Sequence, residues 1–333
     1  MIGAFARRVG QAVVTLAIAF VVIFVAVRVL PNNPVLARYG QHATPERVAS
    51  TMAENGWDRP IPAQLARFGW GLVTRFDLGR SFTSREPVTA VLARTIPATV
   101  ELTIAAMAIA FPLGVGAGVV AAVYRDRWPD WLMMTGALVG VSIPIFFLGI
   151  CLIAAFPSLP TGMRLPTDLY DAEFDLPSGF YVLESILRGR FDLTAAALRH
   201  LVLPAVTLAT IPTAIIARIT RAAVADVLAS DYIRTARAKG ASRWRVLVRH
   251  ALPNAAVPIA NITGFQVGAL LSGAVLTETV FAWPGLGSEM VRAVLMSDYA
   301  VVQAGGLVIA TMFVTLNLLL DLLFRRLDPR LRT

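Results

Sequence analysis

The sequence predicts an all-α membrane protein that crosses the bilayer six times. Of its 333 residues 56% are hydrophobic and 15% are charged, whereas soluble domains carry roughly 25% charged residues. The mean hydropathy is +0.67. Six apolar stretches approach or exceed the about 20 residues with which a helix crosses a bilayer. The basic residues gather at the ends of these stretches, as membrane topology requires.

The six predicted spans contain no charged side chain within their apolar runs. They cover residues 9–27, 102–124, 131–156, 201–217, 251–277 and 299–320. Prolines inside spans are tolerated where neighbouring helices or waters bind the freed carbonyl groups, and the glycines at 114, 116 and 118 favour close helix packing. The first span follows Arg7 and Arg8, as a signal peptide would. Its uncharged run exceeds the about 7–15 residues of a signal core, so we expect an uncleaved anchor.

The distribution of basic residues predicts the orientation. Six crossings place both termini on one side of the membrane, and the segments on that side carry sixteen basic residues against a few acids. Basic segments favour the cytoplasm, so we expect both termini there. The loop at 157–200 is net acidic or neutral. The loop at 31–94 carries eight arginines, but loops longer than roughly 60 residues follow the charge rule poorly.

The first external loop is predicted to hold short amphipathic helices on the outer membrane surface. Thr44 is a suitable N-cap, Pro45 suits a first helical position, and residues 62–76 repeat large apolar side chains at helical spacing. We therefore expect an anchor at 1–30, an extracytoplasmic loop at 31–95, a core of five spans at 96–326 that includes a cytoplasmic loop at 231–253, and a cytoplasmic tail at 327–333.

Signatures of catalysis and cofactor binding are absent from the sequence. There is no G-x-x-x-x-G-K-[ST] loop, no G-x-S-x-G or H-E-x-x-H motif, and no metal-ligand spacing among the three histidines. Cys151 is the sole cysteine, which excludes a disulfide within the chain. The net charge of +9 is explained by basic residues at span ends, not by a face for nucleic acid. We expect a non-catalytic protein without cofactor, metal or nucleic-acid partner.

Polar and aromatic groups in or beside the spans are candidates for a translocation path or gate. They are Glu101, Asn261, Gln266, Ser272, Glu278 and Trp283. Charged residues inside a bilayer are costly and often mark a pathway, whereas pairing at the interface and helix–helix hydrogen bonds are the alternatives. Trp283 opens a stretch at 283–287 whose proline and glycines predict a rigid turn. The alternative for its indole is anchoring at the lipid surface.

The segment 231–258 is the most distinctive part of the chain. It is a basic, helix-like run between two long apolar spans. Its six positive charges are Arg234, Arg237, Lys239, Arg243, Arg245 and Arg249. Ala236, Ala238 and Gly240 make its near end small-sided, so that the surface of another protein can approach the backbone. These features indicate a cytoplasmic docking element for a soluble partner.

The same segment resembles the cytoplasmic loop of permease subunits of binding-protein-dependent ABC transporters. That loop reads EAA, three residues, Gly, nine residues and I-x-L-P, and this chain meets the spacing throughout. Arginine, threonine and histidine replace the family's E, first A and I, and the resulting RTARAKG and RHALPNA resemble the dipeptide/oligopeptide branch. The docking residues that the resemblance implies are Arg234, Thr235, Ala236, Ala238, Lys239, Gly240, Leu252 and Pro253.

Other stretches resemble that branch too, and the resemblance extends from about residue 8 to residue 330. They read DRPIP, DLGRSF, HLVLP and ETVFAWPGLG. The long first external loop is similar to that of the larger, B-type permease subunit. The resemblance implies a MetI-like permease core preceded by an N-terminal helix, in the inner membrane of a bacterium and surrounded by lipid. In it, Pro253 would end the loop helix and start the next span.

The resemblance also implies the partners. The chain would form half of a heterodimeric channel with a homologous permease subunit, two ATP-binding cassette ATPases would dock on its cytoplasmic loop, and an extracytoplasmic binding protein would deliver peptides. Nickel chelates, glutathione or another small solute are alternative cargoes. A secondary ion-coupled transporter is the alternative class, but it requires an inverted repeat and charges near the midplane, and neither is visible. A membrane-embedded hydrolase would need a nucleophile–base pair, for which candidates are thin.

The predicted orientation is testable with single cysteines in a Cys151→Ala background. An impermeant thiol reagent applied to intact cells should label Ser50→Cys in the external loop and leave Ser242→Cys unlabelled until the cells are opened, because the basic segment faces the cytoplasm. The opposite labelling pattern would reverse the topology.

Overall fold

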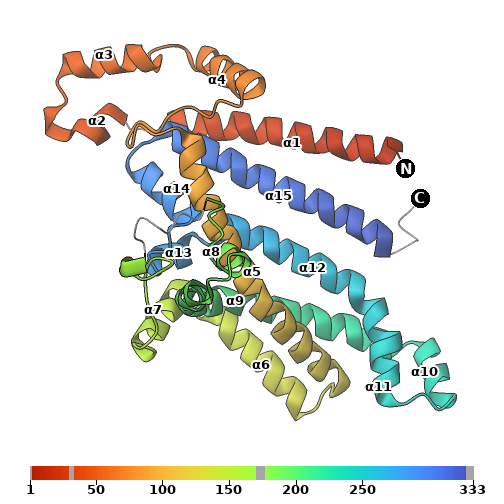
Figure 1. The fold of residues 1–333 in the computed structure, drawn as a ribbon. Coiled ribbons are helices and arrows are strands. Elements are labelled where there is room, and N and C mark those ends of the chain that lie inside the picture. The colour runs from red at the N-terminus through yellow and green to blue at the C-terminus, as the bar shows by residue number, and fades with distance from the viewer. Residues whose placement is uncertain (1, 30–33, 170–176, 328–333) are drawn as a thin grey trace. The chain divides into compact units, whose positions relative to one another are not determined.

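The computed structural model describes residues 2–29, 34–169 and 177–327 (Figure 1). These ranges consist of helices joined by turns and irregular loops, with one isolated bridge between Arg80 and Pro87. The all-α prediction is confirmed. Of the predicted tail at 327–333, residues 328–333 lie outside the described residues, and Leu327 is the last residue of helix α15 (Tyr299–Leu327). The chain forms two compact units, the first from Met1–Thr99, Pro177–Gly179 and Pro284–Thr315, and the second from Val100–Leu176, Phe180–Trp283 and Leu316–Thr333.

The described residues contain five helices that are long and apolar enough to cross a membrane, and the count is six if one bent pair is a single span. The long helices are α1 (Ile2–Val29), α5 (Val88–Val123), α9 (Phe191–Leu228), α12 (Leu252–Gly273) and α15 (Tyr299–Leu327). The span predicted at 201–217 is too short, because the charged residues beside it end an apolar run without ending the helix. Pro204 and Pro212 both lie inside α9.

The third span is not the straight helix that its apolar run suggested. It consists of α6 (Trp128–Ser142) and α7 (Ile145–Ala155), which meet at an angle of 99°. Proline disfavours helical geometry in the residue before it, and Ile143, which precedes Pro144, is indeed extended with φ −83° and ψ 124°. Pro144 therefore ends α6 and begins α7 in a new direction.

Short helices fill the loop after α1, as predicted. They are α2 (Pro34–Tyr39), α3 (Pro45–Asn55) and α4 (Ile61–Arg75), with a 3₁₀ turn at Gly40–His42. The Thr44 side chain caps α3 by accepting a hydrogen bond from the Arg47 N–H at 3.3 Å, and Pro45 occupies the first turn. The start of α3 is therefore encoded locally.

α4 folds back against α1 within the first unit. The ring of Phe68 lies 5.8 Å from that of Phe20 and 6.0 Å from that of Phe24, measured between centroids. Phe76, expected to continue the apolar stripe of α4, instead ends the helix at φ 50° and is exposed. α4 is therefore amphipathic over its first three turns only.

A buried carboxylate fastens the chain that precedes α5 to the start of α15. Asp298 accepts hydrogen bonds from Ser81 Oγ at 2.6 Å, from Phe82 N at 3.2 Å and from Thr83 N at 3.0 Å. It also caps α15 by accepting from Val301 N at 3.4 Å. The adjacent core of the unit, which includes α14 (Leu286–Leu295), consists of Val88, Leu92, Leu286, Ala293, Val301 and Ala304.

In the second unit, α9 is the helix against which α6, α7, α12 and α8 (Tyr181–Leu187) pack. α5 approaches it closely at two glycines. A Cβ on Gly114 would lie 2.9 Å from Ile216, and one on Gly118 would lie 2.5 Å from the Ala217 carbonyl oxygen. The close packing predicted for these glycines is confirmed. Gly116 faces open space, so its predicted packing role is wrong for this chain alone.

Removing the Asp298 carboxylate should loosen the chain that precedes α5. Asp298→Ala leaves four buried or half-buried donors without a charged acceptor, so we expect a loss of about 2–3 kcal/mol in the free energy of unfolding. Chemical unfolding of the full chain in detergent measures it, and limited proteolysis should cut faster near Ser84. Asp77→Ala, which removes an exposed carboxylate that accepts only from Gly79 N among described groups, is the control. Equal losses in the two variants would contradict the anchoring role.

Candidate functional site

The basic segment forms two short helices joined by a tight reversal. α10 (Asp231–Ala238) follows α9 after two residues, and α11 (Arg243–Val246) starts where Ser242 accepts a hydrogen bond from Arg245 N at 3.3 Å. Figure 1 shows α10 and α11 side by side at one end of α12. The helix-like character predicted for this segment is confirmed.

Gly240 closes α10 by a Schellman motif. Its φ of +83° lies in the left-handed region, which glycine adopts without the steric cost that other residues meet. The Gly240 N–H donates to the Arg237 carbonyl at 3.0 Å, and the Ala241 N–H donates to the Ala236 carbonyl at 3.1 Å. No atom lies within 4 Å of a Cβ placed on Gly240. The glycine is therefore required by the turn, and space remains around it for another surface.

The helices α10 and α11 are solvent-exposed except at one buried residue each. Ile233 and Val246 are buried, whereas most of the other side chains are exposed. The exposed residues include the predicted docking residues Arg234, Thr235, Ala238, Lys239 and Gly240, with Ala236 half-buried. Sequence reasoning missed the aromatic part of this surface, because Trp244 and Tyr232 are also exposed. The surface is thus basic and aromatic as well as small-sided.

Pro253 lies at the start of the next span, as expected, but the prediction that it ends the loop helix is wrong. One continuous helical stretch runs over Arg243–Ser272, and residues Leu247–Ala251 within it form a π-turn in which the Leu252 N–H donates to the Leu247 carbonyl. Pro253 sits in the first turn of α12, where a missing N–H costs nothing, and the wide turn carries the helix past it. Leu252 and Pro253 therefore belong to the span, not to the exposed loop.

Glu101 is part of a buried ion pair. Its carboxylate lies 2.5 Å from the Arg164 guanidinium, both side chains are buried, and it also accepts a hydrogen bond from Val182 N at 2.7 Å. The same guanidinium lies over the ring of Tyr181 at 3.7 Å. The pair therefore connects three segments, which are α5, the loop that follows α7, and α8. Arg164 gave no signal in the sequence, because it lies in an irregular loop.

Trp283 lies beside this pair and is only 1% exposed, with its ring centroid 5.7 Å from the Arg164 guanidinium. The alternative of anchoring at the lipid surface is therefore wrong. The predicted turn is present, because α13 (Val275–Val280) ends where Trp283 N donates to the Glu278 carbonyl at 2.7 Å, and α14 begins at Leu286. The Glu278 side chain is fully buried. A gating role for Trp283 and Glu278 stays a prediction.

The polar residues predicted on α12 do not form one group. Asn261 and Ser272 lie on an exposed face with Phe265, whereas Gln266 is buried. Ser272 Oγ donates within its own helix to the Gly268 and Ala269 carbonyls. The structure thus separates the six predicted path residues into two exposed on α12, one buried on α12, and three buried in or near the turn and ion pair. Their role in a path stays a prediction.

Comparison with known proteins gives consistent matches over the chain. A family model described as "Binding-protein-dependent transport system inner membrane component" matches residues 114–333, and the model of its N-terminal part matches residues 1–103. The chain is 41% identical over 317 residues to the "Dipeptide transport system permease protein DppB" of Alkalihalophilus pseudofirmus, with 94% of each chain covered. It is 40% identical over 331 residues to the protein of the same name in Escherichia coli, with 98% and 97% covered. It is also 40% identical over 335 residues to the "Di/tripeptide transport system permease protein DppB" of Pseudomonas aeruginosa, with 100% and 99% covered.

The buried pair predicts that removing one of its charges destabilises the chain more than removing both. Arg164→Met should destabilise the chain by about 3–5 kcal/mol, because the Glu101 carboxylate stays buried without a cation. Combining it with Glu101→Gln should recover more than half of that loss, since no uncompensated charge remains. Chemical unfolding in detergent measures the free energy of unfolding of the two single variants and of the double variant. A double variant as unstable as the sum of the two single variants would contradict the pairing.

Proposed function

This chain belongs to the family of binding-protein-dependent transport system inner membrane components, and on that premise we propose that it forms half of the translocation path of an ATP-driven importer of short peptides. The relatives named for dipeptide and di/tripeptide transport match nearly its whole length, which supports peptide as the cargo. The observation that carries the coupling role is the exposed basic helix α10, closed at Gly240 by a left-handed turn.

The proposed topology places both termini and α10 in the cytoplasm. Two ATP-binding cassette ATPases would dock on α10 and hydrolyse ATP, while this chain stays non-catalytic. A homologous permease subunit would complete the channel, and an extracytoplasmic binding protein would deliver the peptide. The exposed α12 face of Asn261, Phe265 and Ser272 is the part of the predicted path best placed to meet cargo, because its side chains are not occupied by packing within this chain.

The connections of α10 explain how docking could move the spans. Only two residues separate α10 from α9, and α11 continues through the π-turn into α12 without a break. The Asp130 carboxylate lies 2.5 Å from both Arg221 Nε and Arg221 Nη2, which ties the start of α6 to α9 near the same end. A displacement of α10 would therefore be passed to several helices together. Such rigid shifts of packed elements are how bistable interfaces switch.

Substitutions at Gly240 separate docking from turn geometry. Both Gly240→Ala and Gly240→Trp force an L-residue into a left-handed conformation at a cost of about 1–2 kcal/mol. Only the Trp variant also fills the space next to the small-sided surface. We expect Gly240→Trp to abolish receptor-stimulated ATP hydrolysis and uptake in proteoliposomes while inserting normally, and Gly240→Ala to retain most activity.

The control for this experiment is the amount of chain that inserts and assembles with its partners, measured for both variants. Wild-type uptake by an assembled Gly240→Trp complex would remove the docking role of this surface. Equal loss in the two variants would assign the effect to the turn and not to the surface.

A further inference from the structure

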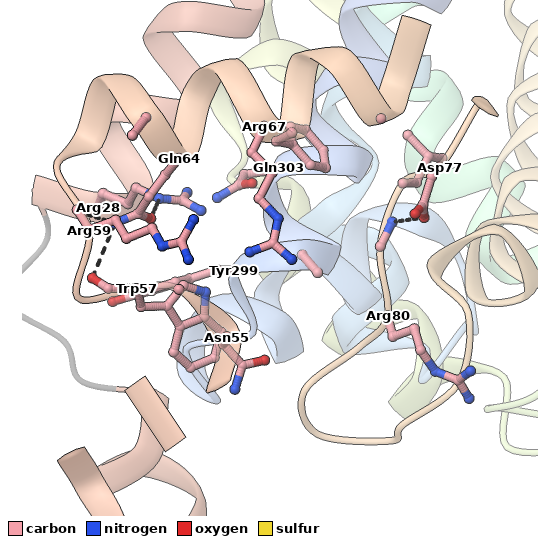
Figure 2. Close-up of a pocket in the computed structure, with 17 residues that line it drawn as sticks. Arg28, Asn55, Trp57, Arg59, Gln64, Arg67, Asp77, Arg80, Tyr299 and Gln303 are labelled. Carbon is pink, nitrogen blue, oxygen red and sulfur yellow. Dashed lines mark hydrogen bonds between the residues drawn. The ribbon is translucent and has the colours of Figure 1, made fainter. Parts of the chain in front are cut away.

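A cavity of about 260 Å³ lies within the first unit and is lined mostly by polar side chains. Its walls come from the end of α1, the connection between α3 and α4, α4 itself, the loop at 77–80 and the start of α15. Figure 2 shows Arg28, Arg59, Arg67 and Gln303 gathered on one side of it, with Asp77 on the other. None of the functions argued above uses this cavity.

The cavity holds more positive charge than the protein itself neutralises. Four arginines line it against one acid, and in the described part of the chain none of the four forms an ion pair. They are Arg28, Arg59, Arg67 and Arg80, of which Arg80 lies apart from the other three (Figure 2) and donates from Nε and Nη2 to the Arg85 carbonyl at 3.2 and 2.8 Å. The single acid, Asp77, accepts from Gly79 N at 2.8 Å instead. Guanidinium groups in a shared, partly enclosed space repel one another unless an anion lies between them.

Two buried donors at the cavity lack partners among the described residues. They are Arg28 Nη1 and Gln303 Nε2, and the Gln303 side chain is only 4% exposed. Arg28 is held in place by the bond from its Nε to Gln64 Oε1 at 2.6 Å and by the Phe24 ring 3.7 Å from its guanidinium. A buried donor without an acceptor is destabilising. These donors indicate that a hydrogen-bond acceptor from outside the described residues binds at this site.

The cavity lies at the level of the membrane boundary. Arg28 is in the last turn of the candidate span Arg7–Val29, and Tyr299 and Gln303 are in the first turns of the candidate span Tyr299–Leu320. α4, which covers the cavity with Gln64, Arg67 and Phe68, presents Trp70 and Val73 on another face, where they are 71% and 77% exposed. A helix with a basic polar face and exposed Trp and Val is suited to lie in the interface plane among lipid headgroups.

We propose that this cavity binds the phosphate of an anionic phospholipid, with the Arg59 and Arg67 guanidinium groups as its principal ligands and Arg28 and Gln303 as donors behind them. The planar guanidinium fork matches phosphate oxygens in geometry and charge. The bound lipid would clamp α4 onto the ends of α1 and α15. On the proposed topology this lipid would lie in the outer leaflet of the membrane, whereas the binding itself does not depend on that topology.

Native mass spectrometry of the purified full chain in detergent tests the proposal with phosphatidylglycerol and phosphatidylcholine of identical acyl chains. We expect one phosphatidylglycerol to bind about tenfold or more tightly than phosphatidylcholine, and Arg67→Gln to weaken it about tenfold, the change that loss of a strong charge-assisted contact brings. Gln303→Leu should weaken it as well, although it leaves the net charge unchanged. Arg75→Gln, on the same helix but outside the cavity, should bind as the wild type does.

Equal weakening in Arg67→Gln and Arg75→Gln would overturn the site in favour of general surface charge. Displacement of the lipid by millimolar inorganic phosphate would overturn the lipid assignment in favour of a free anion. Equal binding of the two lipids would overturn the requirement for an anionic headgroup. Because lipid retention is measured without transport or ATP hydrolysis, its failure leaves the proposed transport function untouched, and a transport failure leaves this inference untouched.

Discussion

A chain inside hydrocarbon has to satisfy each backbone N–H and C=O group within its own helix, and this constraint decides where the permease can change direction. The described spans stay helical, and each departure has a local cause. Pro144 ends α6 and turns the chain by 99°. The π-turn before Pro253 lets one helix continue past a proline. The full reversal at Gly240 occurs in the exposed segment between spans, where the turn can be completed. The proposed coupling segment is therefore a reversal between two long helices.

The structure contains charged groups that are paired within the chain and charged groups that are not. Three buried acids have partners in the chain: Glu101 is paired with Arg164, Asp130 with Arg221, and Asp298 accepts from backbone and hydroxyl donors. These groups act as braces, since a buried carboxylate without a partner is strongly destabilising. The arginines of the first unit's cavity are the contrast, because none of them forms an ion pair in the described part of the chain. The three acids are paired within the chain, whereas the cavity arginines are proposed to bind an anion from outside the chain.

Local features could be predicted from the sequence, and features made by distant residues could not. The cap at Thr44, the turn at 283–287 and the helical character of the basic segment depend on neighbouring residues, so their signals are contained in short stretches. The ion pair of Glu101 depends on a partner 63 positions away in an irregular loop, and no periodicity marks Arg164. The continuation of the loop helix past Pro253 could not be predicted either, because the π-turn that accommodates this proline has no sequence signature of its own.

The arginines of the loop at 31–94 show the same limit. Their number is plain in the sequence, but the charge rule says little for so long a loop. Three of them, Arg59, Arg67 and Arg80, line one cavity with Arg28 of α1, and this arrangement depends on α4 folding back onto α1 through Phe68. Only tertiary packing of this kind turns a scattered set of charges into a site.

The central claim, that α10 is the contact through which ATPase subunits act on this chain, is tested most directly by site-specific crosslinking in the assembled complex. Ala238→Cys in a Cys151→Ala background, treated with a short bifunctional thiol reagent, should yield a covalent adduct with an ATPase subunit that carries single cysteines along its permease-facing groove. Ser50→Cys should yield none. Absence of any ATPase adduct from Ala238→Cys in a complex that hydrolyses ATP on receptor binding would contradict the account.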